Sequence, residues 1–311
     1  MYKGCHITVV IPCYNEEKFI GPLISSLPSL IDTIIVVDDC SQDETSRMAE
    51  SQNDERVLVL KTPYNQGVGG ATKEGYRKAL DIGSDIVVKM DGDGQMSPAY
   101  LPDLLDPILE DGYMYTKGNR FLCPDALPHM PRHRLFGNIV LTFMNKLGSG
   151  YWHIFDPCNG YTAIKAEVLR KLDLAAIHKR YFFESDMLVQ LNCNRVPVKD
   201  VAMKAKYGGE ESSLNPLKIG FTFPFLMLRK FFHRVYIKYI LRDFSPIALF
   251  LFLGLILFSG GTIVGIYLWI RSIITEHPTP TGTIMLALVP MILGFQLLLQ
   301  AVVLDIQDTP R

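Results

Sequence analysis

Four short runs of apolar, largely β-branched residues constrain the fold of this chain more than any other feature. They cover residues 6–11, 33–37, 57–60 and 86–90, and polar loops and helical patterns separate them. The first run is apolar almost throughout, so we expect a strand buried on both faces, as in a parallel sheet. Repetition of strand, loop and helix predicts an α/β domain with a mostly parallel sheet.

Polar side chains stand where each of these predicted strands ends. In chain order they are Asn15 and Glu16, Asp38 and Asp39, Asn65, and Asp91 and Asp93. Ligands of parallel α/β sheets bind at the carboxyl ends of the strands, so these groups are expected to meet at one edge. Turn formation alone does not require that convergence.

Residues 91–95 read Asp-Gly-Asp-Gly-Gln and carry three oxygen donors at alternate positions. Such donors suit a hard divalent cation, either Mg²⁺ or Mn²⁺. The same residues are also good turn formers, because Asp and Gly tolerate tight backbone angles. Agreement with the other strand ends favours a metal site formed by Asp91, Asp93 and Gln95.

Two local patterns have structural interpretations. The glycines at 67, 69 and 70 match neither the dinucleotide fingerprint nor a phosphate loop, which disfavours hydride transfer and P-loop chemistry. We expect them to serve packing or helix entry. The Ser-Gln-Asp-Glu sequence at 41–44 matches a capping box and predicts a helix that opens there.

Composition narrows the functional classes. The formal net charge of −1 gives no basis for nucleic-acid binding. Six cysteines without a Cys-x-x-Cys pair indicate reduced thiols in a cytosolic compartment. The first strand begins within six residues, with no basic segment followed by an apolar core, so we expect no cleaved signal peptide.

The C-terminal third predicts a membrane anchor. Residues 246–270 and 282–304 contain no charged side chain, and each is long enough to span a bilayer, which needs about 20 apolar residues. The link at 271–281 is short, so the two segments are expected to form a helical hairpin.

The stretch before the first predicted span is both basic and aromatic. Lys230, Arg234 and Lys238 lie four apart on one helical face. Another face carries Leu228, Phe231, Phe232, Val235 and Tyr239. This pattern predicts an amphipathic helix lying in the membrane interface.

Charge distribution predicts the orientation of the chain. Basic residues crowd before the first span, whereas the hairpin link has only Arg271. The positive-inside rule therefore puts the N-terminal domain and the C-terminus in the cytoplasm. The predicted parts are a cytoplasmic domain at 1–214, juxtamembrane helices at 215–243 and a hairpin with a short tail at 244–311.

Four blocks of this sequence resemble family 2 glycosyltransferases in content, order and spacing. They are Val-Val-Ile-Pro-Cys-Tyr-Asn-Glu-Glu at 9–17, Val-Val-Asp-Asp-Cys-Ser-Gln-Asp-Glu-Thr at 36–45, Asn-Gln-Gly at 65–67, and the 91–95 segment. The resemblance implies the A-type glycosyltransferase fold, a nucleotide-sugar donor and a divalent metal at the Asp-x-Asp motif. Gln95 matches the third metal ligand of the dolichyl-phosphate mannose synthase branch. The implied nucleotide-sugar contacts are Pro12, Tyr14, Asn15, Glu16, Asp38, Asp39, Asn65 and Asp91.

The same resemblance extends to later residues. Asp156, with the Gly-Tyr pair that follows, is similar to the acceptor-side Asp of the family, and Glu184 and Asp186 are similar to its acidic motif. Both acids also suit the first turn of a helix. Lys206 has the place of a loop that closes over the donor diphosphate, where the branch often carries Arg. The implied catalytic residues are Asp93, Asp156, Arg120 and Lys206, and the implied acceptor-phosphate residues are Arg120, Arg132 and Arg134. The basic cluster at 132–134 is equally compatible with a solvated face.

The combined features predict a polyisoprenyl-phosphate glycosyltransferase. It would move a hexose, with inversion, from a UDP- or GDP-sugar to a polyisoprenyl phosphate at the cytoplasmic face of the cell membrane, or of the endoplasmic reticulum in a eukaryote. A processive polysaccharide synthase is disfavoured, since neither Trp152 nor Trp269 follows a Gln-x-x-Arg-Trp motif. A non-catalytic nucleotide-sugar-binding membrane protein is the other alternative. Donor sugar, prenyl chain and oligomeric state, a homo-oligomer included, stay open.

Overall fold

The computed structural model describes residues 1–122, 132–157, 159–204 and 216–310, with backbone alone at 132–136, 138 and 216–221. The chain divides into two compact units. The first is Met1–Phe231 with the last residues of the chain, and the second is Phe232–Thr309. The division lies within a helix, α8 (Pro216–Tyr236), beyond the boundary that the sequence predicts at 214.

The described part of the first unit contains a seven-stranded sheet in the order β3-β2-β1-β4-β6-β5-β7. Its strands are β1 (Ile7–Cys13), β2 (Thr33–Asp38), β3 (Val57–Lys61), β4 (Ile86–Lys89), β5 (Tyr115–Asn119), β6 (Thr162–Lys165) and β7 (Val198–Ala202). β6 runs antiparallel to β4 and β5, and the other pairs are parallel. The prediction of a mostly parallel sheet is confirmed.

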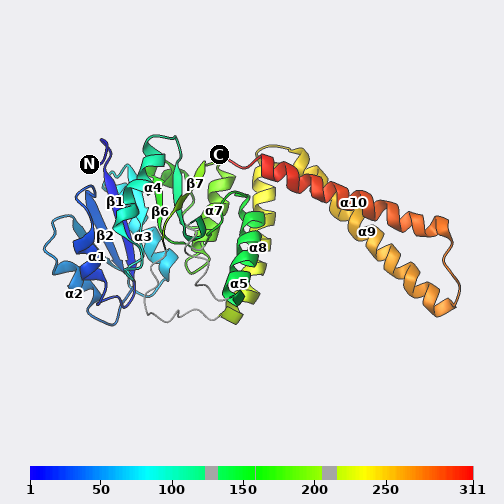
Figure 1. The fold of residues 1–311 in the computed structure, drawn as a ribbon, viewed down its shortest axis with the longest axis horizontal. Helices are drawn as coiled ribbons and strands as arrows, with labels where there is room; N and C mark the ends of the chain where they lie inside the picture. The colour runs from blue at the N-terminus through cyan, green and yellow to red at the C-terminus, as the bar shows by residue number, and fades with distance from the viewer. Residues whose placement is uncertain (123–131, 158, 205–215, 311) are drawn as a thin grey trace. The chain divides into compact units, whose positions relative to one another are not determined.

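Helices pack around this sheet (Figure 1). They are α1 (Ile20–Ser26), α2 (Thr45–Glu50), α3 (Val68–Asp81), α4 (Leu101–Leu109), α5 (Arg132–Ser149), α6 (Ala166–Lys171), α7 (Phe183–Cys193) and α8. Alternate β1 residues enter different cores: Val9 packs in a cluster with α1 and α4, and Val10 in one with α3 and α7. Every β1 residue is buried, which confirms the expected burial on both faces.

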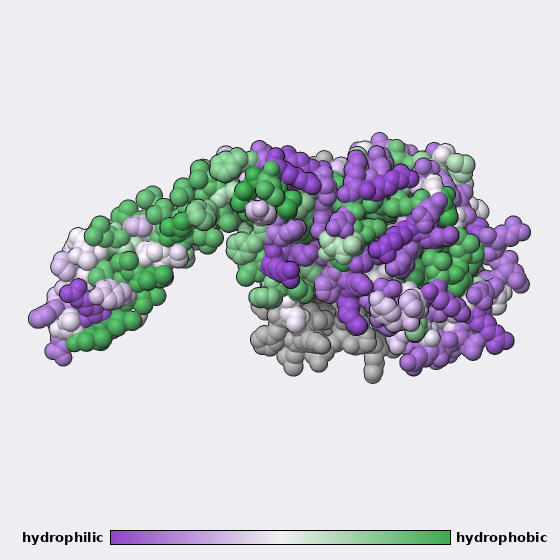
Figure 2. Space-filling view, turned by 180° about the vertical axis from the view of Figure 1, so that it is seen from behind, coloured by the Kyte–Doolittle hydropathy of each residue, from purple (hydrophilic) through white to green (hydrophobic). Residues whose placement is uncertain are grey.

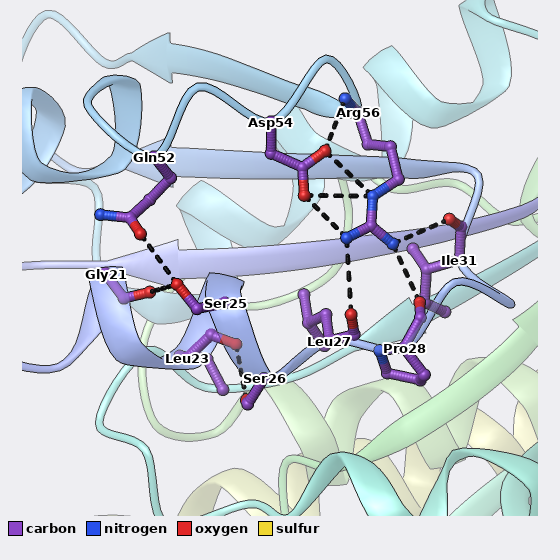
Figure 3. Close-up of polar contacts among 10 residues, drawn as sticks. All are labelled: Gly21, Leu23, Ser25, Ser26, Leu27, Pro28, Ile31, Gln52, Asp54 and Arg56. Atoms are coloured by element: carbon purple, nitrogen blue, oxygen red, sulfur yellow. Dashed lines mark hydrogen bonds and ion pairs between the residues drawn. The ribbon is translucent and has the colours of Figure 1, made fainter.

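Arg56 holds together the loops beside the β3 edge of the sheet (Figure 3). Its guanidinium donates to the Asp54 carboxylate at 2.7 Å and to the carbonyls of Pro28, Ile31 and Leu27 at 2.9, 3.3 and 3.4 Å. One side chain thereby satisfies backbone acceptors that follow α1, where no helical partner exists. The Arg56 contact also holds the pKa of Asp54 below its usual range.

The predicted capping box at residues 41–44 is wrong, because α2 begins only at Thr45. Ser41 joins two other loops instead: its Oγ accepts from the Asn15 amide at 3.0 Å, and its own amide donates to Asp38 at 2.8 Å. The Asp43 carboxylate accepts from the Thr45 amide at 3.1 Å. The Ser41 hydroxyl therefore bonds to the loop after β1 and not to the first turn of α2, where a capping box would place it.

The second unit contains α9 (Pro246–Thr275) and α10 (Thr281–Gln307), the two described helices long and apolar enough to cross a membrane. Apolar residues cover most of their surface (Figure 2). Gly294 lets the helices approach closely, because a Cβ there would collide with the Phe258 backbone. The hairpin link is shorter than predicted, since α9 continues through Arg271 and leaves only residues 276–280 between the helices.

Three basic residues of the stripe before α9, Lys230, Arg234 and Lys238, form ion pairs with acids, so this stripe is not the exposed charged face that the amphipathic prediction implies. Arg229 and Arg242 are exposed. In the second unit Arg234 is fully buried and pairs with Asp305 at 2.6 Å, and Lys238 pairs with Asp308 at 2.7 Å. Within the first unit, Lys230 pairs with Asp186 at 2.6 Å. Apolar side chains are also exposed along this stretch: Phe225, Leu228, Phe232, Tyr236 and Ile240.

Candidate active site

The loops after β1 and β2 are joined by hydrogen bonds. The Asn15 side-chain oxygen accepts from the Gln42 amide at 2.9 Å, and the Glu16 amide donates to Thr45 Oγ1 at 2.8 Å. Asn15 has a φ of +59°, a conformation that Asn tolerates better than most residues. The two strand ends therefore form one continuous rim, as the sequence predicts.

Asp38 and Asp39 organise the next two loops. Asp39 is buried and accepts from Thr62 Oγ1 at 2.9 Å, from the Gln66 amide at 2.9 Å and from the Gly67 amide at 2.7 Å. Asp38 is also buried and accepts from Ser41 and Ser46. These contacts fix the loops after β2 and β3 together, and the predicted contacts of both acids with a nucleotide sugar stay predictions.

The glycines after β3 serve packing and helix entry, as predicted. Gly67 precedes α3 with a φ of +84°, where a residue with a Cβ is strained. A Cβ on Gly69 would lie 2.7 Å from the His178 carbonyl oxygen. The loop that carries the half-buried Asn65 is thus held against the segment before α7.

The Asp-Gly-Asp-Gly-Gln segment forms a tight turn against the end of β1. A Cβ on Gly92 would lie 2.7 Å from Cys13 Sγ, so the backbone approaches β1 closely there. The Asp93 carboxylate accepts from the backbone N–H of Gln95 at 2.9 Å, and Gly94 has a φ of +70°. The turn after β4 therefore meets the rim formed by the loops after the first three strands. In the loop after β1, Pro12 is buried and Tyr14 is exposed.

Asp91 is held by a residue that the sequence reasoning missed. Lys89, the last residue of β4, is 1% exposed, and its ammonium donates to Asp91 at 2.6 Å and to Glu184 at 3.1 Å. Burial alone lowers the pKa of Lys89, but the two carboxylates more than offset it and raise the pKa above its usual value. The available signal was a lysine inside an otherwise apolar strand.

The donors of this turn fit a hard divalent cation. Across the residues that the structure describes, no three His, Cys, Asp or Glu side chains gather where they would hold a metal. The set predicted here is instead two carboxylates and one amide on a single turn. Mg²⁺ typically binds one or two carboxylates together with water and substrate phosphates, so the chemistry of this donor set is compatible with such a metal, and the site stays a prediction.

Arg120 and Asp156, predicted separately, form one unit. Arg120 Nε and Nη2 donate to the two Asp156 oxygens at 2.7 and 3.0 Å, and the Arg120 amide donates at 3.2 Å. The Arg120 side chain is 37% exposed, whereas that of Asp156 is 3% exposed. Asp156 therefore acts as a buried anchor that fixes the direction of a partly exposed guanidinium.

A second carboxylate lies behind this pair. Asp200 accepts from Asn119 Nδ2 at 2.6 Å and from the Phe155 amide at 3.0 Å. Burial, with a smaller contribution from the Asp156 charge, raises the pKa of Asp200 to about 6 against the lowering effect of these hydrogen bonds and of Lys117. The backbone that presents Asp156 is thus held by an acid that titrates near neutral pH.

The two acids of the motif at the start of α7 have different partners. Glu184 contacts Lys89 behind the metal turn, and Asp186 accepts from the His178 amide at 2.9 Å and pairs with Lys230. These specific contacts go beyond the favourable effect of first-turn acids on a helix dipole. Lys206 and the side chains of Arg132 and Arg134 lie outside the described residues, and the latter two belong to the first turn of α5.

Comparison with known proteins supplies the family. Residues 8–173 match the model of glycosyl transferase family 2. The chain belongs to this family. It is therefore a glycosyltransferase, and the A-type fold implied by its motifs is confirmed in the order and direction of its strands.

Named relatives of this family 2 glycosyltransferase include enzymes of lipid-linked sugar synthesis. A UDP-N-acetylglucosamine–dolichyl-phosphate N-acetylglucosaminyltransferase of Methanococcus voltae is 33% identical over 216 residues, covering 65% of this chain and 86% of the relative. A polyprenol monophosphomannose synthase of Mycolicibacterium smegmatis is 33% identical over 191 residues, covering 58% and 69%. Glucosyl-3-phosphoglycerate synthase of Mycobacterium tuberculosis shares the fold, with a TM-score of 0.56 at 22% identity over 74% of this chain and 80% of that one.

Proposed function

We propose that this glycosyltransferase moves a hexosyl group from a UDP- or GDP-sugar to a polyisoprenyl phosphate, with inversion at the anomeric carbon. The observation that carries the proposal is the joining of three strand-end loops, the metal-type turn after β4 and an anchored arginine in one unit of a chain that also bears two membrane-length helices. Relatives named for dolichyl-phosphate and polyprenol acceptors support the lipid acceptor.

The residues suit the chemistry of this transfer. A phosphate monoester acceptor is already anionic near neutral pH, so the reaction needs no strong general base. The larger demand is the charge that develops on the leaving nucleoside diphosphate. A divalent cation held by Asp93 and Gln95, with Asp91 beside them, would supply Lewis-acid stabilisation of that charge. The structural neighbour from Mycobacterium tuberculosis was solved with Mn²⁺ and UDP-glucose.

Arginines provide the means to position the acceptor phosphate. Arg120 has a planar guanidinium suited to bidentate phosphate contact, and Asp156 orients it. Arg132 and Arg134 begin α5, where the helix dipole adds positive potential for an anion. Lys206 would close over the donor phosphates, with its charge but not the two-pronged geometry of Arg.

The ion pairs of the second unit support a hairpin with both ends on one side of the membrane. Lys238 precedes α9 and Asp308 follows α10, and their charged groups lie 2.7 Å apart. With 30 residues, α9 is about 45 Å long at 1.5 Å per residue and exceeds the about 30 Å bilayer core. Basic residues concentrated before α9 favour the cytoplasm for that shared side. The exposed apolar side chains of α8 would then contact the membrane interface.

Asp93→Ala tests the metal assignment. Membranes containing the variant should transfer labelled sugar to polyprenyl phosphate at least about 100-fold more slowly than wild type, because the lost metal contribution is several kcal/mol. Asp81→Ala, an exposed acid at the end of α3, is the matched control and should keep the wild-type rate. A wild-type rate for Asp93→Ala contradicts the assignment.

A further inference from the structure

Lys89 is a charged residue in the interior of the first unit, at the end of the central strand that leads into the metal-type turn. With 1% of its surface exposed, it lies beneath the surface of the candidate site. Its ammonium nevertheless lies 2.6 Å from Asp91 Oδ1, 3.1 Å from Glu184 Oε1 and 3.4 Å from the Gly160 carbonyl oxygen. All three partners are acceptors, so the ammonium has a complete set of three contacts.

The Gly160 backbone packs closely against the Lys89 ammonium and the Asp91 carboxylate. A Cβ on Gly160 would lie 2.5 Å from both Asp91 Oδ2 and Lys89 Nζ. One oxygen of Asp91 is thus held by the ammonium, and the other lies close to the Gly160 backbone, with no room for a side chain there unless Asp91 and Lys89 move. The carboxylate is constrained on both sides although 31% of the Asp91 side chain is exposed.

We propose that Lys89 is a positioning residue of the metal-binding turn, which sets the orientation of Asp91 from beneath and joins it to Glu184 of α7. The inference rests on the proposed metal site and goes further, because it names the buried group that fixes one of its carboxylates. Groups that orient metal-site ligands from behind commonly change metal affinity by about 10- to 100-fold when they are replaced.

The alternative is that Lys89 merely neutralises two buried acids. Charge arithmetic separates the two roles. Asp91, Glu184 and Lys89 together carry a formal charge of −1, from two carboxylates and one ammonium. Lys89→Met alone makes this charge −2, whereas Lys89→Met with Glu184→Gln returns it to −1. The double variant therefore removes the hydrogen bond to Asp91 without changing the local net charge.

The experiment measures Mn²⁺ binding by the full chain in detergent, using the electron paramagnetic resonance signal of free Mn²⁺, alongside thermal unfolding. We expect the double variant to unfold near the wild-type temperature and to bind Mn²⁺ about 10- to 100-fold more weakly. Glu184→Gln alone keeps the contact between Lys89 and Asp91 and should stay within about threefold of wild type, below the range of about 10- to 100-fold expected when a positioning group is lost. A folded double variant with wild-type Mn²⁺ affinity overturns the proposal.

Gly160→Ala gives an independent reading if the double variant unfolds. It retains every charge, and its Cβ would displace the ends of the Asp91 and Lys89 side chains, so it should weaken Mn²⁺ binding in the same range, and an unchanged affinity overturns the proposal. Lys73→Met controls for the loss of a buried lysine elsewhere, since Lys73 donates to the Ile177 carbonyl at 2.6 Å. Asp93→Ala is measured in parallel. If it binds Mn²⁺ like wild type, the metal site itself is misassigned, a failure distinct from that of Lys89.

Discussion

Asp156→Asn should slow glycosyl transfer because it disturbs the orientation of Arg120. We expect no separate contribution of Asp156 to the reaction. The substitution preserves the size of the side chain, but it removes the negative charge and turns one acceptor into an N–H donor facing the guanidinium. Arg120 then loses one of its contacts with Asp156 at 2.7 and 3.0 Å, so its orientation is held less firmly. Its predicted contact with the acceptor phosphate is weakened as a consequence.

The magnitude follows from the geometry of the pair. Opposite charges about 4 Å apart attract by about 4 kcal/mol at an effective dielectric constant of about 20. Because the Arg120 side chain is 37% exposed, solvent screening reduces this figure, and about 2 kcal/mol of coupling is a reasonable expectation. That coupling corresponds to about 30-fold in kcat/KM.

A double-mutant cycle with Asp156→Asn, Arg120→Gln and their combination measures this coupling. The assay is kcat/KM for polyprenyl phosphate, with unfolding temperature as the check on folding. We expect the combined variant to be no less active than Arg120→Gln alone, since residues that act as one unit are not additive. Losses that multiply in the combined variant would refute the reasoning and give Asp156 a separate role.

Three further outcomes follow from the packing. Gly69→Ala should cost about 1–3 kcal/mol by overpacking, seen as a lower unfolding temperature, and a neutral effect would contradict the close approach to the segment before α7. Burial raises the pKa of Asp200 to about 6, above that of an unfolded carboxyl, so the native state keeps a proton that the unfolded state releases. Stability should fall as pH rises from about 4 to about 6, by at most about 3 kcal/mol, and Asp200→Asn should flatten this dependence in unfolding scans across pH. Asp305→Asn removes the carboxylate that pairs with the buried Arg234, and detergent unfolding assays should show a loss of about 3–5 kcal/mol, which Asp305→Asn combined with Arg234→Met should largely recover.

The sequence predicted the strands and the convergence of their ends because both depend on local patterns. An apolar β-branched run such as that of β1 is buried on two faces wherever it forms a parallel strand, and the loops after such strands meet at one edge by topology. The tight turn at 91–95 follows from its Asp and Gly residues in the same way. These features need no knowledge of partners distant in the chain.

The side-chain partners could not be predicted, because they are distant in the sequence and no local pattern indicates them. Arg120 and Asp156 were each predicted as site residues, yet 36 positions separate them, and the pairing of β5 with β6 and β7 brings their segments together. Lys89 reaches Glu184 across 95 positions. The stripe that includes Arg234 was predicted from its spacing, but spacing gives no direction, and the buried acid near the end of α10 decides which way it faces.

The transfer reaction itself is the most direct test of this account. Purified full-length protein, polyprenyl phosphate and Mg²⁺ or Mn²⁺ should be incubated with a series of UDP- and GDP-sugars, and the lipid fraction should be analysed by mass spectrometry. We expect one donor to add a single hexosyl mass to the polyprenyl phosphate, with at least about 100-fold less of this product from Asp93→Ala. A water-soluble product with no glycolipid from any donor would contradict the proposed function.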